Sequence, residues 1–65
     1  MNNNANPIDV SELVINNIYK ITTKKGTILA KFVGRNKNEG LHFVLDANKH
    51  TLVLKVSEIQ NIYEQ

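Results

Sequence analysis

The stretch that decides the fold is residues 18–56, which read IYKITTKKGTILAKFVGRNKNEGLHFVLDANKHTLVLKV. Apolar and polar residues alternate along four short runs in it, and β-branched and aromatic residues are frequent. A period of two is typical of half-buried β-strands. Polar segments with glycine or asparagine separate the runs, as in hairpin connections. The pattern predicts four antiparallel strands over residues 18–23, 27–33, 41–46 and 51–56.

The flanking segments predict a short helix before these strands and a fifth strand after them. Asp9 is a good helix N-cap, and Glu12 stands three residues later, where its carboxylate can reach back to the cap amide. We expect about two helical turns, ended by Asn16-Asn17. The remaining residues predict a single 3₁₀ turn over residues 57–59 and a closing strand over residues 60–63.

Five short strands joined by hairpins predict an all-β fold, a small five-stranded barrel of the SH3-like or Sm-like kind with a short N-terminal helix. Residues 1–7 hold almost nothing apolar, so we expect a disordered tail there and one barrel domain over residues 8–65. A chain of this size buries only ~60% of its unfolded surface. With no cysteine to form disulfides, a partner subunit is one way to add stability.

Alternation also predicts which side chains face the core. The inward face of the second strand has an alternative, in which Leu29 and Val33 replace Ile28 and Phe32. Leu13 and Val14 are expected to cover one mouth of the barrel. The full predicted core is Tyr19, Ile21, Ile28, Ala30, Phe32, Leu41, Phe43, Leu45, Leu52, Leu54, Val56, Ile59 and Ile62.

The register of the last hairpin depends on its turn. With Asn48-Lys49 at the centre, the pairs are Leu45–Leu52, Phe43–Leu54 and Leu41–Val56 on one face, with Val44–Val53 and His42–Lys55 on the other. With Ala47-Asn48 at the centre, His50 stands opposite Leu45. We favour the first register, because all its inward pairs are apolar.

Charge is distributed unevenly along the chain. The net charge is +2, but all eight basic residues lie between Lys20 and Lys55, and four of the six acids lie outside that span. A basic centre attracts phosphates and acidic groups, although lysine-rich hairpins are also ordinary solvated edges. The candidate contacts with nucleic acid or an acidic partner are Lys24, Lys25, Lys31, Arg35, Lys37 and Lys49.

The residues predict neither an enzyme nor a metal or cofactor protein, and no catalytic residue is assigned. A nucleophile needs a nearby base, and neither Ser11 nor Ser57 has a histidine close in sequence. His42 and His50 flank one hairpin and could approach each other, but no acid or third histidine stands at ligand spacing. The three glycines serve turns, so no phosphate-binding loop is predicted.

One run resembles a known family. Residues 25–34, Lys-Gly-Thr-Ile-Leu-Ala-Lys-Phe-Val-Gly, resemble the strand-2 motif of Sm-like proteins, with Ala30 in place of the first strand glycine. Residues 54–62 look like that family's fourth strand, turn and fifth strand. The chain departs from the family's RNA-binding pattern at residues 35–38 and 55–57, so the resemblance implies a fold and we assign no RNA-binding residue from it.

The functional expectations are broad. We expect a non-enzymatic binding module, such as a protein-interaction, inhibitor or adaptor protein; the alternatives are an Sm-like RNA- or DNA-binding regulator and a small-molecule sponge. Apolar runs are too short for a membrane span and no secretory signal is evident, so we expect a cytoplasmic protein with no membrane partner. Ten asparagines with many Lys and Ile are typical of a low-GC bacterium or its phages and plasmids.

Self-association is the expected way to complete the fold. The hypothesis is a homo-oligomer in which the fourth strand of one copy pairs with the fifth strand of the next, with Val44, Val53 and Lys55 at the interface. The reason for this hypothesis is that Val44 and Val53 would otherwise form an outward apolar pair beside an unpaired strand edge. The alternative is a monomer in which the N-terminal helix covers that surface.

Overall fold

The structure is a computed structural model that describes residues 7–38 and 40–65. It confirms an all-β fold with five antiparallel strands. The predicted tail lies outside the described residues, apart from Pro7, which is exposed. The elements in chain order are the 3₁₀ turn η1 (Val10–Glu12), the strands β1 (Ile18–Thr23), β2 (Gly26–Arg35), β3 (Gly40–Leu45) and β4 (Thr51–Lys55), the 3₁₀ turn η2 (Val56–Glu58) and the strand β5 (Ile59–Glu64).

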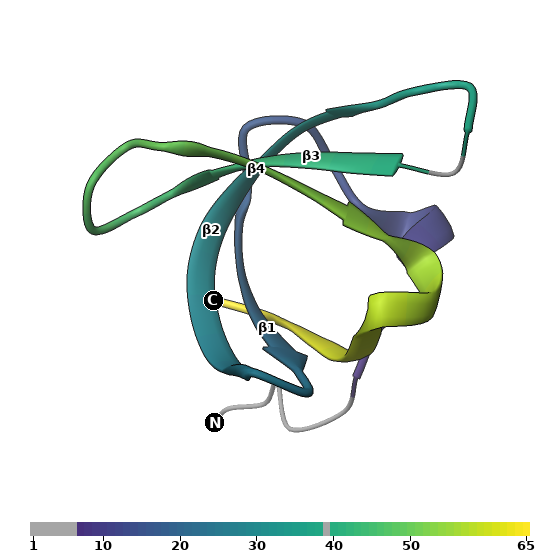
Figure 1. Cartoon of the computed structure of the whole chain (residues 1–65), viewed down its shortest axis with the longest axis horizontal. Helices are drawn as coiled ribbons and strands as arrows, with labels where there is room; N and C mark the ends of the chain where they lie inside the picture. Colours follow the sequence, from purple (N-terminus) through teal and green to yellow (C-terminus); the bar gives the residue numbers. More distant parts are fainter. Residues whose placement is uncertain (1–6, 39) are drawn as a thin grey trace.

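The strands form one curled sheet in the order β4-β3-β2-β1-β5 (Figure 1). In the described part of the chain, β4 and β5 are the two edges and do not pair with each other, so the prediction of a closed barrel is wrong. One reason lies at the β5 edge, where the Ile8 N–H donates to the Ile62 carbonyl (2.8 Å). The other lies after Lys55, where the chain leaves β4 and turns into η2.

The long strand β2 makes the curl possible. Residues 26–31 of β2 pair with β1 and residues 30–35 pair with β3, so β2 belongs to both halves of the sheet. The register shifts between Phe32 and Gly34, and Gly34 has a φ of 147°. A bulge bends a strand and increases its twist, which lets the sheet wrap around its own side chains.

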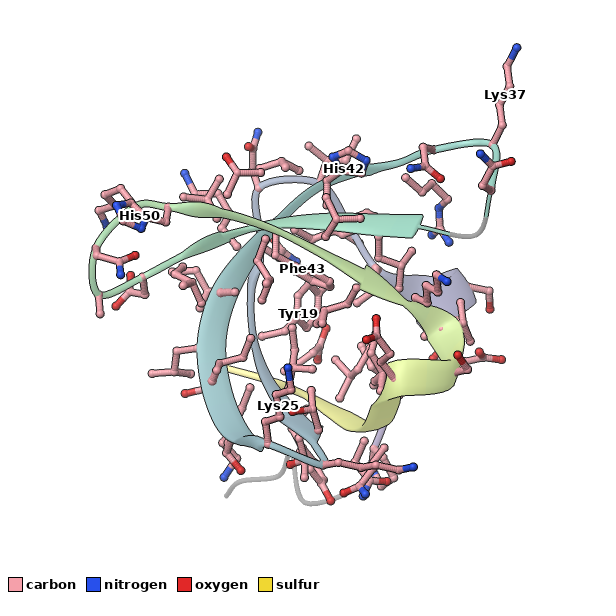
Figure 2. The ribbon with its side chains drawn as sticks, in the orientation of Figure 1. Tyr19, Lys25, Lys37, His42, Phe43 and His50 are labelled. Atoms are coloured by element: carbon pink, nitrogen blue, oxygen red, sulfur yellow. The ribbon has the colours of Figure 1, made fainter. Side chains whose placement is uncertain are left out.

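The core lies on the concave face of the sheet, and Figure 2 shows Tyr19 and Phe43 inside the curl. Phe32 and Phe43 pack with ring centroids 5.5 Å apart. The predicted inward face of β2 is confirmed, because Phe32 is buried while Leu29 and Val33 are 43% and 38% exposed. Other predicted core residues that are buried or packed against the core are Leu13, Tyr19, Ile21, Ile28, Ala30, Leu41, Phe43, Leu45, Leu52, Leu54, Ile59 and Ile62.

The N-terminal helix is shorter than expected. The predicted capping box is present: Asp9 Oδ1 accepts from the Ser11 N–H (3.4 Å) and Glu12 Oε1 accepts from the Asp9 N–H (3.2 Å). Only one 3₁₀ turn follows, because the chain becomes extended at Leu13 (φ −67°, ψ 135°). Successive side chains of an extended segment point in opposite directions, so Leu13 enters the core and Val14 stays 53% exposed.

The predicted register of the β3–β4 hairpin is wrong by two residues. Phe43 stands opposite Leu52 and Leu41 opposite Leu54, and the Leu45 N–H donates to the His50 carbonyl (2.8 Å). This is the register that the sequence analysis rejected. Since a slip of two residues keeps every side chain on its face, the faces are right although the pairs are not. Val56 consequently falls outside β4, in η2, and is exposed rather than buried.

Tyr19 provides a test of how the N-terminal segment is held. Its hydroxyl accepts a hydrogen bond from the Val14 N–H (2.8 Å) at the buried end of the ring. We expect Tyr19→Phe to lower the free energy of unfolding by about 1 kcal/mol, because the amide loses its acceptor. Chemical denaturation measures the loss, and hydrogen exchange should show that the Val14 amide proton exchanges faster. An equal loss for Tyr63→Phe, a half-buried tyrosine, would contradict this interpretation.

Candidate functional site

A groove of about 690 Å³ lies where the sheet fails to close. It runs between the β1–β2 turn on one side and β4 with η2 on the other. Its volume is in the range of about 300–1,000 Å³ that is typical of ligand sites. We call it the β4 groove; its lining residues are Thr23, Lys24, Lys25, Ile28, Leu52, Val53, Leu54, Ser57 and Glu58.

The floor of the β4 groove is the open side of the hydrophobic core. Leu54 is a core residue, and Ile28 and Leu52 are half-buried and pack against the core. A closed barrel would enclose these side chains in its interior. Here they remain partly accessible to solvent, so an apolar side chain placed in the groove would remove further apolar surface from water.

The free edge of β4 borders the same groove. The bond between Leu45 and His50 shows which pairs of the hairpin exchange hydrogen bonds, and in an antiparallel ladder such pairs alternate with pairs that do not. Leu52 and Leu54 therefore direct their N–H and C=O groups toward β3. Thr51 and Val53 direct theirs to the other side, where no described strand pairs with β4. The edge thus offers two adjacent sets of backbone donors and acceptors.

The carboxylate of Glu58 ends this open edge. Its Oε1 accepts a hydrogen bond from the Lys55 N–H (2.8 Å), so the next amide along the β4 edge is already occupied. The chain then turns through η2 toward β5. The accessible part of the edge is short, and an incoming strand must be aligned with Thr51 and Val53.

The rim of the β4 groove is basic on the side of the β1–β2 turn. Lys24 and Lys25 form the two central residues of that turn, because Thr23 pairs with Gly26. Both side chains are exposed, and neither forms an ion pair with a described acidic residue. The Thr23 hydroxyl accepts from the Lys25 N–H (3.1 Å) and donates to the Gly26 carbonyl (3.1 Å), which fixes the turn.

The other predicted basic contacts do not join this rim. Lys31 lies on the convex face between Ile18 and Val44, and Arg35 lies over the Phe32 ring and donates to the Val10 carbonyl. Lys49 pairs with Asp46 (3.7 Å). Figure 2 shows Lys37 far from Lys25. The six candidates therefore do not form one continuous basic surface.

The residues predicted for a subunit interface lie at or near the β4 edge. Val53 is 49% exposed and stands opposite His42, while Val44 stands opposite Thr51. The two valines are diagonal neighbours on the convex face rather than the direct pair that was expected. Lys55 stands opposite Gly40 at the end of the strand. In the described part of the N-terminal segment, the Ile8 N–H bonds to the Ile62 carbonyl of β5, at the other edge of the sheet.

The two histidines remain apart. His50 stands opposite Leu45, which lies three residues along β3 from His42, or about 10 Å away. Figure 2 shows the two histidines at separate places along the hairpin. His42 Nε2 lies 3.3 Å from Asn36 Nδ2. In the described part of the chain no three His, Cys, Asp or Glu side chains form a group that could hold a metal.

A second hollow, of about 600 Å³, lies at another part of the surface. Its polar lining residues include Asn16, Asn17, Asp46 and Glu64. Helices long and apolar enough to cross a bilayer are absent from residues 7–38 and 40–65. The β4 groove is the better candidate site, because it combines an apolar floor, free backbone groups and a charged rim.

Sequence reasoning identified only part of this site. Lys24, Lys25 and Val53 were candidates, but for two different surfaces. The accessibility of Ile28 and Leu52 was missed, because alternation marks them simply as core residues. The role of Glu58 had a readable signal: it follows Lys55 by three residues, which is the spacing of a capping box.

Comparisons with protein families, curated proteins and solved structures give no match for this chain. The resemblance of residues 25–34 to Sm-like proteins therefore stays a prediction.

Proposed function

We propose that this protein is a non-enzymatic binding module that takes an extended segment of another protein into the β4 groove as an added strand. The observation that carries the proposal is the free edge of β4 beside an exposed part of the core. Strand addition uses backbone hydrogen bonds for affinity and side-chain pockets for specificity. The groove offers both, since Thr51 and Val53 supply the backbone groups and Ile28, Leu52 and Leu54 the apolar contacts.

The SH3-like or Sm-like assignment of the fold belongs to the same proposal. Its support is the order of the elements: a short capped turn before the first strand, and a 3₁₀ turn between the fourth and fifth strands. The resemblance implies these two features. The open edge then corresponds to the side on which a closed barrel, or a neighbouring subunit, would complete the sheet.

Val53→Pro tests the strand addition. Because the Val53 N–H points away from β3, proline there removes no ladder bond and is tolerated as in other edge strands. The probe is a fluorescent ten-residue peptide of alternating valine and serine. We expect fluorescence anisotropy to show binding to the natural chain and at least tenfold weaker binding to Val53→Pro, because the edge has lost a donor and gained a ring that obstructs pairing.

Val53→Ala is the matched control, since it shortens the same side chain and keeps the N–H. It should bind the peptide nearly as well as the natural chain does. Hydrogen exchange supplies a measurement that needs no variant: the Thr51 and Val53 amides should become protected when the peptide binds. Equal binding by Val53→Pro and the natural chain, or protection confined to the second hollow, would refute the proposal.

The other expected functions have tests of their own. A labelled single-stranded RNA that binds at low salt and is released steeply as salt rises would favour a nucleic-acid function. The scattered positions of Lys31, Lys37 and Lys49 do not favour that outcome. A small-molecule sponge would hold its ligand between subunits, and it therefore requires an assembly larger than one chain.

A further inference from the structure

We infer that the partner segment is acidic: an extended strand whose alternate apolar side chains enter the β4 groove and whose Asp or Glu residues meet Lys24 and Lys25. This inference rests on the proposed function, because it names the chemistry of the strand that β4 accepts. It is carried by the charges around the groove, by the position of the β1–β2 turn and by the occupied edge of β5.

The charges around the β4 groove are unbalanced. Lys24 and Lys25 lie on one wall, and Lys55 follows Leu54 on the other. The acidic residue of the lining is Glu58, and one of its oxygens is engaged by the Lys55 N–H. Within residues 7–38 and 40–65, none of the three lysines forms an ion pair. No described acidic residue therefore competes with an acidic strand for these lysines.

The position of the turn brings these charges within reach of an added strand. Neighbouring strands lie about 4.8 Å apart, so a strand paired with Thr51 and Val53 enters the space between β4 and the β1–β2 turn. Its residues alternate between the two faces of the sheet. Those that point to the concave face meet Leu52, Leu54 and Ile28. Asp or Glu residues that share this concave face, two residues further along the strand, point toward the lysines of the turn. The long flexible side chains of these lysines can adjust to the exact position.

A second copy of this chain fits the edge less well. Pairing centred on Val53 would require the Lys55 N–H, which Glu58 already occupies. Any symmetric pairing of two β4 strands would also bring two Lys24–Lys25 turns and two Lys55 side chains to one seam, and like charges across an interface are unfavourable. Pairing of β4 with β5 of another copy would have to displace Ile8 from the Ile62 carbonyl.

The test compares three versions of the alternating valine–serine peptide on the natural chain, in which the same two groove-facing valines at one end are replaced by threonine, by aspartate or by lysine; the threonine version is the neutral peptide. An exposed ion pair strengthens binding about two- to fivefold. We therefore expect the aspartate peptide to bind about four- to twentyfold more tightly than the neutral one, and the lysine peptide to bind more weakly than either.

The double variant Lys24→Glu/Lys25→Glu should reverse this order. The double variant Lys24→Gln/Lys25→Gln should remove the preference for the aspartate peptide over the neutral one. Lys37→Glu is the matched control, because Lys37 carries the same charge far from Lys25; it should leave the preference for aspartate intact. Higher salt should weaken the binding of the aspartate peptide more than the binding of the neutral one.

The outcomes separate this inference from the proposed function. If the neutral peptide binds and Val53→Pro abolishes its binding, but aspartate adds nothing, the edge function stands and the acidic partner is refuted. If no peptide binds, both are refuted. Light scattering should give a mass near 7.4 kDa. A multiple of that mass that Val53→Lys lowers would show that a second copy of this chain, and not a strand of another protein, occupies the β4 edge.

Discussion

Phe32→Ala is expected to lower the free energy of unfolding by about 3–5 kcal/mol, the usual cost of removing a buried phenylalanine ring. Phe32 is 1% exposed, and its ring packs against Phe43 at the point where β2 passes from one half of the sheet to the other. The cavity would therefore open between the two halves. Because a small domain has only about 5 kcal/mol of stability to lose, the variant should keep at most about 2 kcal/mol.

Urea denaturation followed by circular dichroism measures this loss. Leu29→Ala is the matched control: it also removes a large side chain from β2, but from the convex face, where Leu29 is 43% exposed. Its cost should stay near 0.5 kcal/mol. Equal losses for the two variants would contradict the assignment of the inward face of β2.

Gly34→Ala is expected to cost about 1–3 kcal/mol for a different reason. Gly34 has a φ of 147°, a conformation that L-amino acids avoid. A Cβ built at this position meets no atom within 4 Å, so the cost is backbone strain and not a steric clash. The bulge that bends β2 would have to relax, and the curl of the sheet around Phe32 with it.

A chain with Gly34→D-Ala separates strain from crowding, and 65 residues are accessible to chemical synthesis. The D-residue carries the same methyl group but accepts a positive φ, so it should keep the stability of the glycine chain or exceed it. Thermal unfolding of the three chains provides the comparison. If the D- and L-alanine chains were destabilised equally, the methyl group and not the dihedral angle would be responsible.

The strands could be predicted because each carries its own signal. Ile18–Thr23 was predicted with the bounds that β1 has, and the other strands within one or two residues. Alternation also separated the faces, placing Phe32 and Phe43 inside and Val53 outside. A side-chain period of two is a local property of an extended backbone, and it needs no knowledge of which strands are neighbours.

The register of the β3–β4 hairpin could not be predicted in the same way. Two registers that differ by two residues keep all side chains on the same faces, so the apolar pattern hardly distinguishes them. The loop decides between them. Lys49 adopts a φ of 63°, its N–H donates to the Leu45 carbonyl (2.9 Å), and the Asn48 side chain accepts from the His50 N–H (3.0 Å). These bonds close a loop of four residues between Leu45 and His50, whereas the predicted register has a two-residue turn.

The sequence by itself determined the class of fold, the faces of the strands and the absence of cysteine chemistry, because these follow from residue identity and local spacing. The tertiary structure alone decided that the sheet stays open and that Lys24 and Lys25 lie across a groove from Val53. These facts depend on contacts between distant segments: the Ile8 amide on Ile62, and the Glu58 carboxylate at the end of β4. No local pattern encodes which edge remains free, since the curvature of β2 sets where the two ends of the sheet arrive.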